Sequence, residues 1–180
     1  MKMLVVVDMQ NDFINGVFGT PEAQAIVPAV CDIIEKFYGP IYATIDVHPK
    51  QGQSIEEKTY APHCLEDKNH TLSHGARFDT NVANALNGKW TQVTRVEKST
   101  FAWTKWNKVY WDEADEIHII GVCTDICVLS NALVLRSVLP KARIIVHANA
   151  CAGTTPEHHE MALEMMRMNC IEVIDDSKFI

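Results

Sequence analysis

The sequence has no hydrophobic run long enough to cross a bilayer. Its longest apolar stretches, such as residues 4–7 and 128–135, fall far short of the roughly 20 residues that a membrane-spanning helix needs. The first residues lead straight into a strand-like run that ends at Asp8, without the apolar core and small-residue cleavage site of a secretory signal. We therefore expect no membrane segment, no signal peptide and a cytoplasmic location.

Positive charge is scarce as well. The chain has 16 lysines and arginines against 23 aspartates and glutamates, which gives a formal net charge of −7. A negative surface repels both a phosphate backbone and an anionic membrane. We therefore expect no nucleic-acid partner and no membrane partner.

Glycine-rich loops and paired cysteines are missing too. The eight glycines form no phosphate-binding loop after any strand-like run, which argues against a nucleotide-binding α/β protein. The six cysteines lack the paired spacing of a disulfide framework, and a chain of 180 residues can bury a sufficient core without such bonds. We therefore expect reduced thiols, of which at least one is available for chemistry.

What the sequence does contain is an alternation of strand-like and helix-like segments. Short apolar, β-branched runs predict six buried strands, at residues 3–7, 41–45, 92–96, 117–121, 143–147 and 171–174. Apolar periodicity and end signals predict helices at residues 22–38, 104–111, 125–139 and 156–168. Thr154 and Glu157 have the spacing of a capping box for the last helix. The chain is thus expected to form one α/β domain over residues 1–180, with helices on both faces of an open parallel sheet.

Residues 47–90 interrupt this alternation. They carry proline, glycine, asparagine and serine and four of the eight histidines, with little hydrophobic periodicity. A structureless stretch of that length inside a compact domain is usually functional.

Reactive side chains follow four of the six predicted strands. Asp8 follows the first strand, Asp46 and His48 follow the second, Lys98 follows the third, and residues 123–127 follow the fourth. In open parallel sheets, ligands bind beyond the carboxyl ends of the strands. We therefore expect these side chains to meet in one site.

Cys127 is the candidate nucleophile. It falls in the first turn of a predicted helix, where unpaired amides and the helix dipole stabilise a thiolate, and a nearby Lys98 would lower the thiol pKa further. The alternative is that Cys127 is a small buried core residue, which is the commonest role of a free cysteine.

Asp46 and His48 are two residues apart, so at an extended strand end their side chains point to the same side. Together with His63 and Glu56 they make a donor set suited to zinc, iron(II) or manganese, with positions left open for water or substrate. The alternative is a group of surface histidines in a polar loop. Cys64 is interpreted as a packing residue.

The sequence resembles the isochorismatase-like cysteine hydrolases, and within them the nicotinamidases. The resemblance covers almost the whole chain and rests on VVDMQNDF at residues 6–13, DVHP at 46–49, Glu97-Lys98, and GVCTDICV at 121–128. The motif EEKTYAPH at residues 56–63 is similar to the second half of the metal motif that separates nicotinamidases from relatives without a metal.

The resemblance implies a role for each of these residues. The implied catalytic triad is Asp8, Lys98 and Cys127, and the implied oxyanion hole consists of the backbone amides of Cys123 and Cys127. The implied ligands of one divalent metal ion, zinc before iron or manganese, are Asp46, His48 and His63, with Glu56 as a less secure fourth. Phe13 and Tyr60 match positions that sandwich the substrate ring. The resemblance also implies the sheet order 3-2-1-4-5-6 and a cis peptide between Val122 and Cys123.

The expected activity is hydrolysis of nicotinamide to nicotinate and ammonia through a cysteine thioester. Two alternatives stay open: a metal-independent amidase or ureido hydrolase of the same family, and a non-catalytic binding module on the same scaffold. The expected partners are a small-molecule amide and further copies of the chain in a homo-oligomer. Trp103, Trp106 and Trp111 are assigned either to a subunit contact or to a cover over the site.

Overall fold

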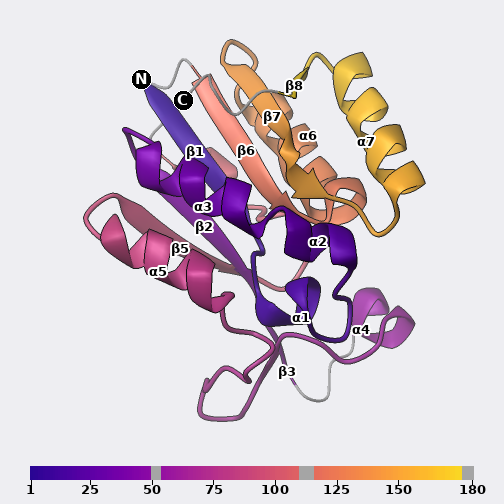
Figure 1. The fold of residues 1–180 in the computed structure, drawn as a ribbon. Coiled ribbons are helices and arrows are strands. Elements are labelled where there is room, and N and C mark those ends of the chain that lie inside the picture. The colour runs from indigo at the N-terminus through magenta and orange to yellow at the C-terminus, as the bar shows by residue number, and fades with distance from the viewer. Residues whose placement is uncertain (50–53, 110–115, 176–180) are drawn as a thin grey trace.

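The computed structural model describes residues 1–49, 54–109 and 116–175. Its centre is a six-stranded parallel sheet in the order β5-β2-β1-β6-β7-β8 (Figure 1). The strands are β1 (Lys2–Val7), β2 (Ile41–Asp46), β5 (Val93–Lys98), β6 (Glu116–Val122), β7 (Arg143–Ala152) and β8 (Glu172–Ile174). The α/β class and the order 3-2-1-4-5-6 are confirmed, because β5 is the third strand of this sheet along the chain.

The central strand β1 is buried on both faces, as its continuous apolar sequence predicts. Leu4 and Val6 pack in the core on one face, and Val5 and Val7 pack in the core on the other. Val7 pairs with Gly121 of β6, whose φ is +121°. A Cβ on Gly121 would lie 2.1 Å from the Val7 carbonyl oxygen, so this close approach requires glycine. It brings the residues that follow β1 and β6 side by side.

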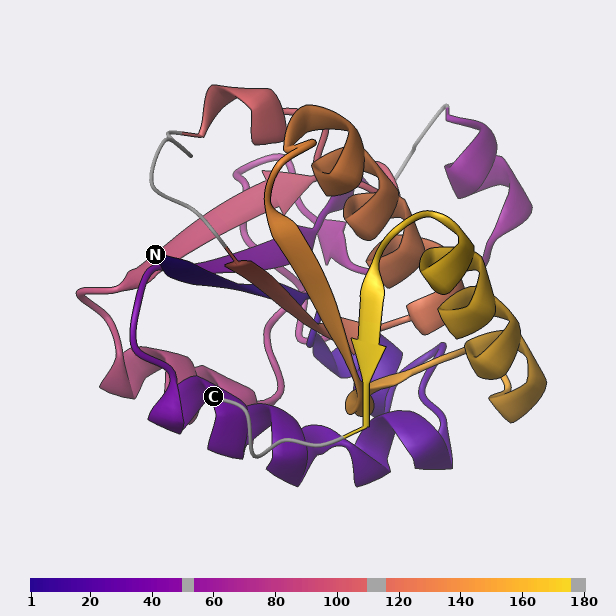
Figure 2. The same ribbon diagram turned by 90° about the horizontal axis from the view of Figure 1, so that it is seen from above.

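Helices cover both faces of the sheet (Figure 2). One face carries α2 (Pro21–Ala25), α3 (Val27–Lys36) and α5 (Thr80–Gly88), and the other carries α6 (Leu129–Val138) and α7 (Pro156–Met168). Two short helices, α1 (Asn11–Ile14) and α4 (Ile55–Thr59), lie beyond the carboxyl ends of the strands (Figure 1). Within the described part of the chain, no helix is both long enough and apolar enough to span a membrane.

The single helix predicted over residues 22–38 is in fact two helices, α2 and α3, which meet at Ile26. Pro28 lies in the first turn of α3 and has no N–H to donate to the preceding turn, so a continuous helix would be interrupted there. The helix predicted over residues 125–139 begins one residue earlier, with the π-helical turn η2 (Thr124–Val128), before α6 continues it.

Two further predictions about helices were wrong. Residues 104–109 contain a short 3-10 turn, η1 (Trp106–Lys108), in place of an α-helix, and the end of that predicted helix lies outside the described residues. The capping residue of α7 is Thr155, whose side chain accepts a hydrogen bond from the His158 amide. Thr154 hydrogen-bonds Asp125 instead, so it does not form a capping box with Glu157.

The described parts of this loop-like stretch, residues 47–49 and 54–90, are more ordered than their sequence indicates. Besides α4 and α5, they contain a small parallel pair of strands, β3 (His48–Pro49) and β4 (Leu65–Glu66). The α5 helix was missed, although Asp79 supplies the N-cap by accepting hydrogen bonds from Asn81 and Val82. This stretch folds over the carboxyl ends of β1 and β2, where the Asn11 and Asp12 amides donate to carbonyls of Arg77 and Gly75. These two hydrogen bonds hold residues 75–77 against the strand ends.

Candidate active site

The side chains predicted to meet at the carboxyl ends of the strands do meet there. The ammonium nitrogen Nζ of Lys98, at the end of β5, lies 2.7 Å from Asp8 Oδ2 and 3.1 Å from Asp46 Oδ1. The same nitrogen lies 3.8 Å from Cys127 Sγ. Since β5, β2, β1 and β6 are parallel neighbours, their ends share one edge of the sheet and bring these four residues together.

Asp8 is completely buried and has a φ of +48°, which is unusual for a residue with a side chain. Its Oδ1 accepts a hydrogen bond of 2.6 Å from the Thr44 hydroxyl, and its amide donates to the same hydroxyl oxygen. Burial raises the pKa of the Asp8 carboxyl above its usual range, although the charge on Lys98 opposes this shift. A carboxylate with a raised pKa beside a thiol is suited to accept a proton.

Cys127 is 6% exposed and lies in the η2 turn at the start of α6. Burial raises the pKa of its thiol well above the ordinary value, Lys98 lowers it, and Asp8 and Asp46 raise it further. The sequence predicted Lys98 as its neighbour correctly, but it predicted the opposite direction for the pKa. The main reason is burial, which disfavours a charged thiolate, and the two carboxylates that face the single ammonium group add to the shift.

A second group of side chains forms a compact donor cluster, which consists of Asp46, His48, Glu56 and His63. One ligand atom from each residue lies within 4.8 Å of all the others. Asp46 Oδ2 is 2.9 Å from His48 Nε2 and 3.3 Å from His63 Nε2, and Glu56 Oε1 is 3.7 Å from His48 Nε2. One or two carboxylates with two imidazoles fit a divalent transition metal such as zinc, so the cluster can hold one.

The charges within the donor cluster act in opposite directions on its ability to bind a metal. Burial alone would raise the pKa of Asp46, but hydrogen bonds to His48 and His63 and the charge on Lys98 hold it below its usual range. Burial lowers the pKa of both histidines, whereas their bonds to Asp46 raise it, and the net shift is upward. Protons therefore compete with a metal for the two imidazoles.

The outward-facing nitrogens of the two histidines also have partners, and the sequence did not reveal them. His48 Nδ1 lies 3.3 Å from Glu57 Oε1, and His63 Nδ1 lies 2.8 Å from the Ala61 carbonyl oxygen. Glu57 is held by Ser54 in a capping box at the start of α4. Such partners set the orientation and tautomer of a ligating imidazole. The serine and glutamate three residues apart were a detectable signal for this turn.

Gln10 is another functional residue that the sequence reading missed. Its Nε2 donates 2.8 Å to the Asp46 carbonyl oxygen, and its Oε1 accepts 2.8 Å from the Asp46 amide. Both bonds are fully buried and hold the backbone of a donor-cluster residue in place. The signal was present, because Gln10 lies in the motif that follows the first strand.

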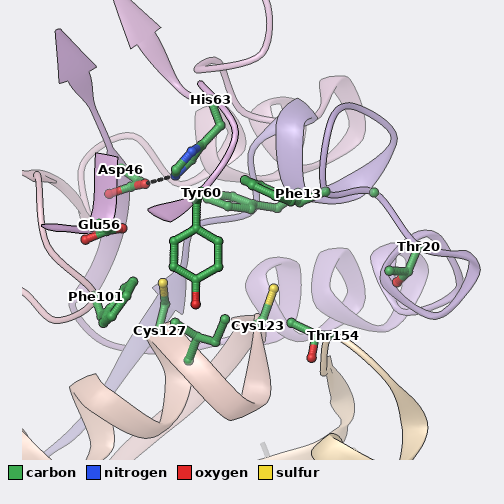
Figure 3. A pocket seen from close by; sticks show the side chains of 13 residues that line it. Phe13, Thr20, Asp46, Glu56, Tyr60, His63, Phe101, Cys123, Cys127 and Thr154 are labelled. Carbon is green, nitrogen blue, oxygen red and sulfur yellow. Dashed lines mark ion pairs between the residues drawn. The ribbon is translucent and has the colours of Figure 1, made fainter. Parts of the chain in front are cut away.

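The candidate nucleophile Cys127 and three of the donor-cluster residues, Asp46, Glu56 and His63, line the same cavity, which has a volume of about 290 Å³ (Figure 3). Phe13 and Tyr60, the predicted ring-binding residues, both line it. Phe18 and Phe101 also line it and were not predicted; the ring centroids of Phe18 and Phe101 lie 6.0 Å and 6.2 Å from that of Tyr60. The wall is therefore aromatic, which suits a flat ring.

The turn that precedes Cys127 has the backbone form that the resemblance implied. The peptide between Val122 and Cys123 is cis. The Cys123 side chain lines the cavity beside Cys127, as Figure 3 shows. Cys64 is fully buried among core residues, in agreement with its interpretation as a packing residue.

Comparison with known proteins establishes the family. The profile of the isochorismatase domain matches residues 2–177. The chain belongs to the isochorismatase family. A nicotinamidase/pyrazinamidase from Mycobacterium tuberculosis is 26% identical over 191 residues, which cover 98% of this chain and 100% of that protein.

Solved structures of other members have the same fold. A pyrazinamidase/nicotinamidase from Streptococcus mutans superposes with a TM-score of 0.83 and 26% identity, covering 97% of this chain and 100% of the other. A pyrazinamidase from Pyrococcus horikoshii in complex with zinc gives a TM-score of 0.80 and 27% identity over 97% of this chain and 99% of the other.

For one of the three tryptophans of this isochorismatase-family chain, the structure decides between the two roles that the sequence left open. Trp106 is fully buried between the sheet and α6, and its ring centroid lies 4.7 Å from that of Trp103. Trp106 is therefore neither a subunit contact nor a cover over the cavity. Trp111 lies outside the described residues.

Proposed function

We propose that this protein is a nicotinamidase, an amidohydrolase that converts nicotinamide and water to nicotinate and ammonia. The observation that carries the proposal is that the Cys127 thiol and the donor cluster open into one aromatic cavity. The thiol supplies a nucleophile for an amide, and the donor cluster can hold a metal beside the same cavity. Relatives named as nicotinamidases and pyrazinamidases support the same conclusion.

The first half of the reaction acylates Cys127. Asp8 accepts the thiol proton, Lys98 stabilises the thiolate, and the sulfur attacks the carboxamide carbon. The negative charge that develops on the carbonyl oxygen is stabilised by the backbone amides of Cys123 and Cys127. Asp8 then returns the proton to the nitrogen, so that ammonia leaves and a nicotinoyl thioester remains on Cys127.

The second half hydrolyses this thioester. Asp8 takes a proton from a water molecule, whose oxygen attacks the thioester carbon. The carbon–sulfur bond breaks, nicotinate is released, and the thiolate is again paired with Lys98. Asp8 thus acts as a base in both halves, which its raised pKa and burial favour.

The donor cluster orients the substrate. Asp46, His48 and His63, with Glu56 as the fourth donor, would hold one divalent metal ion, which we propose to be zinc. The chemistry supplied by the bound ion is Lewis-acid contact with the pyridine nitrogen. Phe13 and Tyr60 flank the ring and exclude water from it, so that the carboxamide reaches Cys127.

The wider setting is part of the proposal. We assign the reaction to pyridine-nucleotide salvage in the cytoplasm, where reducing conditions preserve the six free cysteines. The small-molecule amide is the partner that the cavity supports, and assembly into a homo-oligomer remains our expectation.

The decisive experiment compares nicotinamide with benzamide, which keeps the carboxamide but lacks the ring nitrogen. Ammonia release from both compounds is measured on purified protein whose metal content has been determined. We expect stoichiometric metal and a strong preference for nicotinamide. Equal hydrolysis of the two amides, or full activity without metal, would instead favour the metal-independent amidase or ureido hydrolase. Binding of nicotinamide without any turnover would favour a non-catalytic module.

A further inference from the structure

A single buried amide connects the nucleophile to the wall of the cavity. Asn131, in the first turn of α6, is 0% exposed. Its Nδ2 donates 2.8 Å to the Cys127 carbonyl oxygen and 3.2 Å to the Phe101 carbonyl oxygen. Its Oδ1 accepts 3.0 Å from the Trp103 amide and 2.8 Å from the Trp106 indole Nε1.

These four hydrogen bonds use both N–H groups and both lone pairs of the amide. The surroundings are otherwise apolar, since Val128, Ala132, Leu135 and the Trp106 ring pack in the same core. An unpaired amide at such a position would be strongly unfavourable, whereas a fully bonded one rigidifies the groups that it joins. A leucine could fill a similar volume but could make none of these contacts.

The groups that Asn131 joins lie on two separate segments of the site. Cys127 belongs to the η2 turn, whereas Phe101 belongs to the loop that follows Lys98 at the end of β5. Both residues line the cavity, and Phe101 lies beside Cys127 in Figure 3. Phe101 in turn supports Tyr60, with ring centroids 6.2 Å apart. The amide therefore sets the position of the thiol relative to Lys98 and to the aromatic wall.

We infer that Asn131 is a positioning residue, which holds Cys127 and the loop of residues 101–106 in the arrangement needed for attack. This inference rests on the proposed function only where it is tested by the turnover of nicotinamide. Cys127 Sγ lies 3.8 Å from Lys98 Nζ, at the outer limit of a hydrogen bond to sulfur, so a small shift of the turn removes this contact. Displacements of about 1 Å at a reacting group can reduce a rate on the order of 100-fold.

The test uses three variants of the full chain. Asn131→Leu removes all four hydrogen bonds, whereas Trp106→Phe removes only the bond from the indole N–H and leaves a smaller aromatic ring in the core. Ala132→Gly is the matched control, because it weakens the same helix at a fully buried position and leaves the four hydrogen bonds in place. Far-UV circular dichroism and melting temperature report how much of each variant is folded.

Nicotinamide kinetics are measured well below each melting temperature. For Asn131→Leu we expect kcat to fall about 10- to 100-fold and KM to rise by a smaller factor, because the donor cluster is untouched while Tyr60 loses the support of Phe101. Trp106→Phe should lose a smaller factor in kcat. Ala132→Gly should melt at a lower temperature with kcat unchanged. If Asn131→Leu also melts lower but keeps the wild-type kcat, Asn131 is merely structural and the inference is wrong.

Alkylation of Cys127 by iodoacetamide, followed by mass spectrometry, tests the inference without nicotinamide. We expect Asn131→Leu to be alkylated at least about threefold more slowly than the wild type, since its sulfur loses the contact with Lys98. Ala132→Gly should match the wild type. Slow alkylation together with no hydrolysis of nicotinamide by the wild type would overturn the proposed function and leave the positioning role standing. An unchanged alkylation rate in Asn131→Leu would overturn the positioning role.

Discussion

The ammonium nitrogen of Lys98 lies 3.1 Å from Asp46 Oδ1, and this contact links the candidate triad to the donor cluster. Both side chains are 1% exposed, so the contact is shielded from water. The other oxygen of the Asp46 carboxylate faces His48 and His63. One carboxylate thus serves both halves of the site, and Lys98 stays charged because Asp8 and Asp46 raise its pKa against the effect of burial.

Cys127→Ala should abolish hydrolysis of nicotinamide and leave the fold intact, because alanine is small, apolar and favourable in a helix. Turnover is measured by ammonia release and the fold by circular dichroism. In the wild type, mass spectrometry with a slow substrate should detect an acyl group on Cys127. Wild-type turnover by the alanine variant would rule out the covalent mechanism.

Asp8→Asn should reduce turnover by about 10² to 10⁴-fold, because it removes the group that accepts and returns protons. Lys98→Met should instead raise the pKa of the Cys127 thiol, because it removes the nearby positive charge. Since the Lys98 charge lowers the pKa of Cys127 and the Asp8 charge raises it, alkylation should require higher pH in Lys98→Met and lower pH in Asp8→Asn. Identical pH profiles of iodoacetamide alkylation in both variants would mean that neither residue tunes Cys127.

The variant with both His48→Ala and His63→Ala should lose much of its preference for nicotinamide over benzamide, because two of the metal donors are gone. The same variant should still react with a small alkylating agent, since neither histidine contacts Cys127. Relative rates on the two amides provide the measurement. An unchanged preference for nicotinamide over benzamide in this variant would show that the donor cluster does not determine substrate choice.

Glu57→Gln should lower metal affinity by about 10- to 100-fold, which is the usual effect of losing a partner of a ligating histidine. Glu57 is not a donor itself, but its oxygen lies 3.3 Å from His48 Nδ1 and its pKa is lowered, chiefly by the Ser54 amide, so it is anionic. Metal content after dialysis against a graded chelator gives the affinity. Glu66→Gln, on the neighbouring strand β4, is the control and should bind metal as the wild type does.

The buried pair of His118 and His147 should make stability depend on pH. Their rings share a hydrogen bond of 2.9 Å between Nδ1 of His118 and Nε2 of His147, on β6 and β7. Burial, and then repulsion from His118, lower the pKa of His147 to about 4. Because histidine has the higher pKa in the unfolded state, His147 costs no stability above about pH 6.5. The free energy of unfolding then decreases as the pH falls from about 6.5 toward about 4.

Urea unfolding at several pH values measures this effect. The loss from His147 should approach about 1.4 kcal/mol for each pH unit within that window. His147→Leu should lose less stability over the same window. Equal slopes for the wild type and His147→Leu would show that the pair does not set the acid limit.

Much of the fold could be predicted from the sequence, because strands that are buried on both faces of a parallel sheet have continuous apolar sequences. All six predicted strands exist, and β1 illustrates why, since every residue from Met3 to Val7 is at most 2% exposed. The helices were predicted less well. Pro28 divides one of them, and α5 was missed within a segment whose polar residues resemble those of a loop.

The sequence by itself determined which residues stand at the carboxyl ends of the strands, and parallel neighbours bring such ends to one edge. Only the tertiary structure decided which of these residues pair. Lys98 and Asp46 are 52 positions apart, and Gln10 reaches Asp46 over 36 positions. The upward pKa shift of Cys127 was likewise decided by the tertiary structure, because desolvation and Coulomb interactions depend on burial and on distances that sequence separation does not encode.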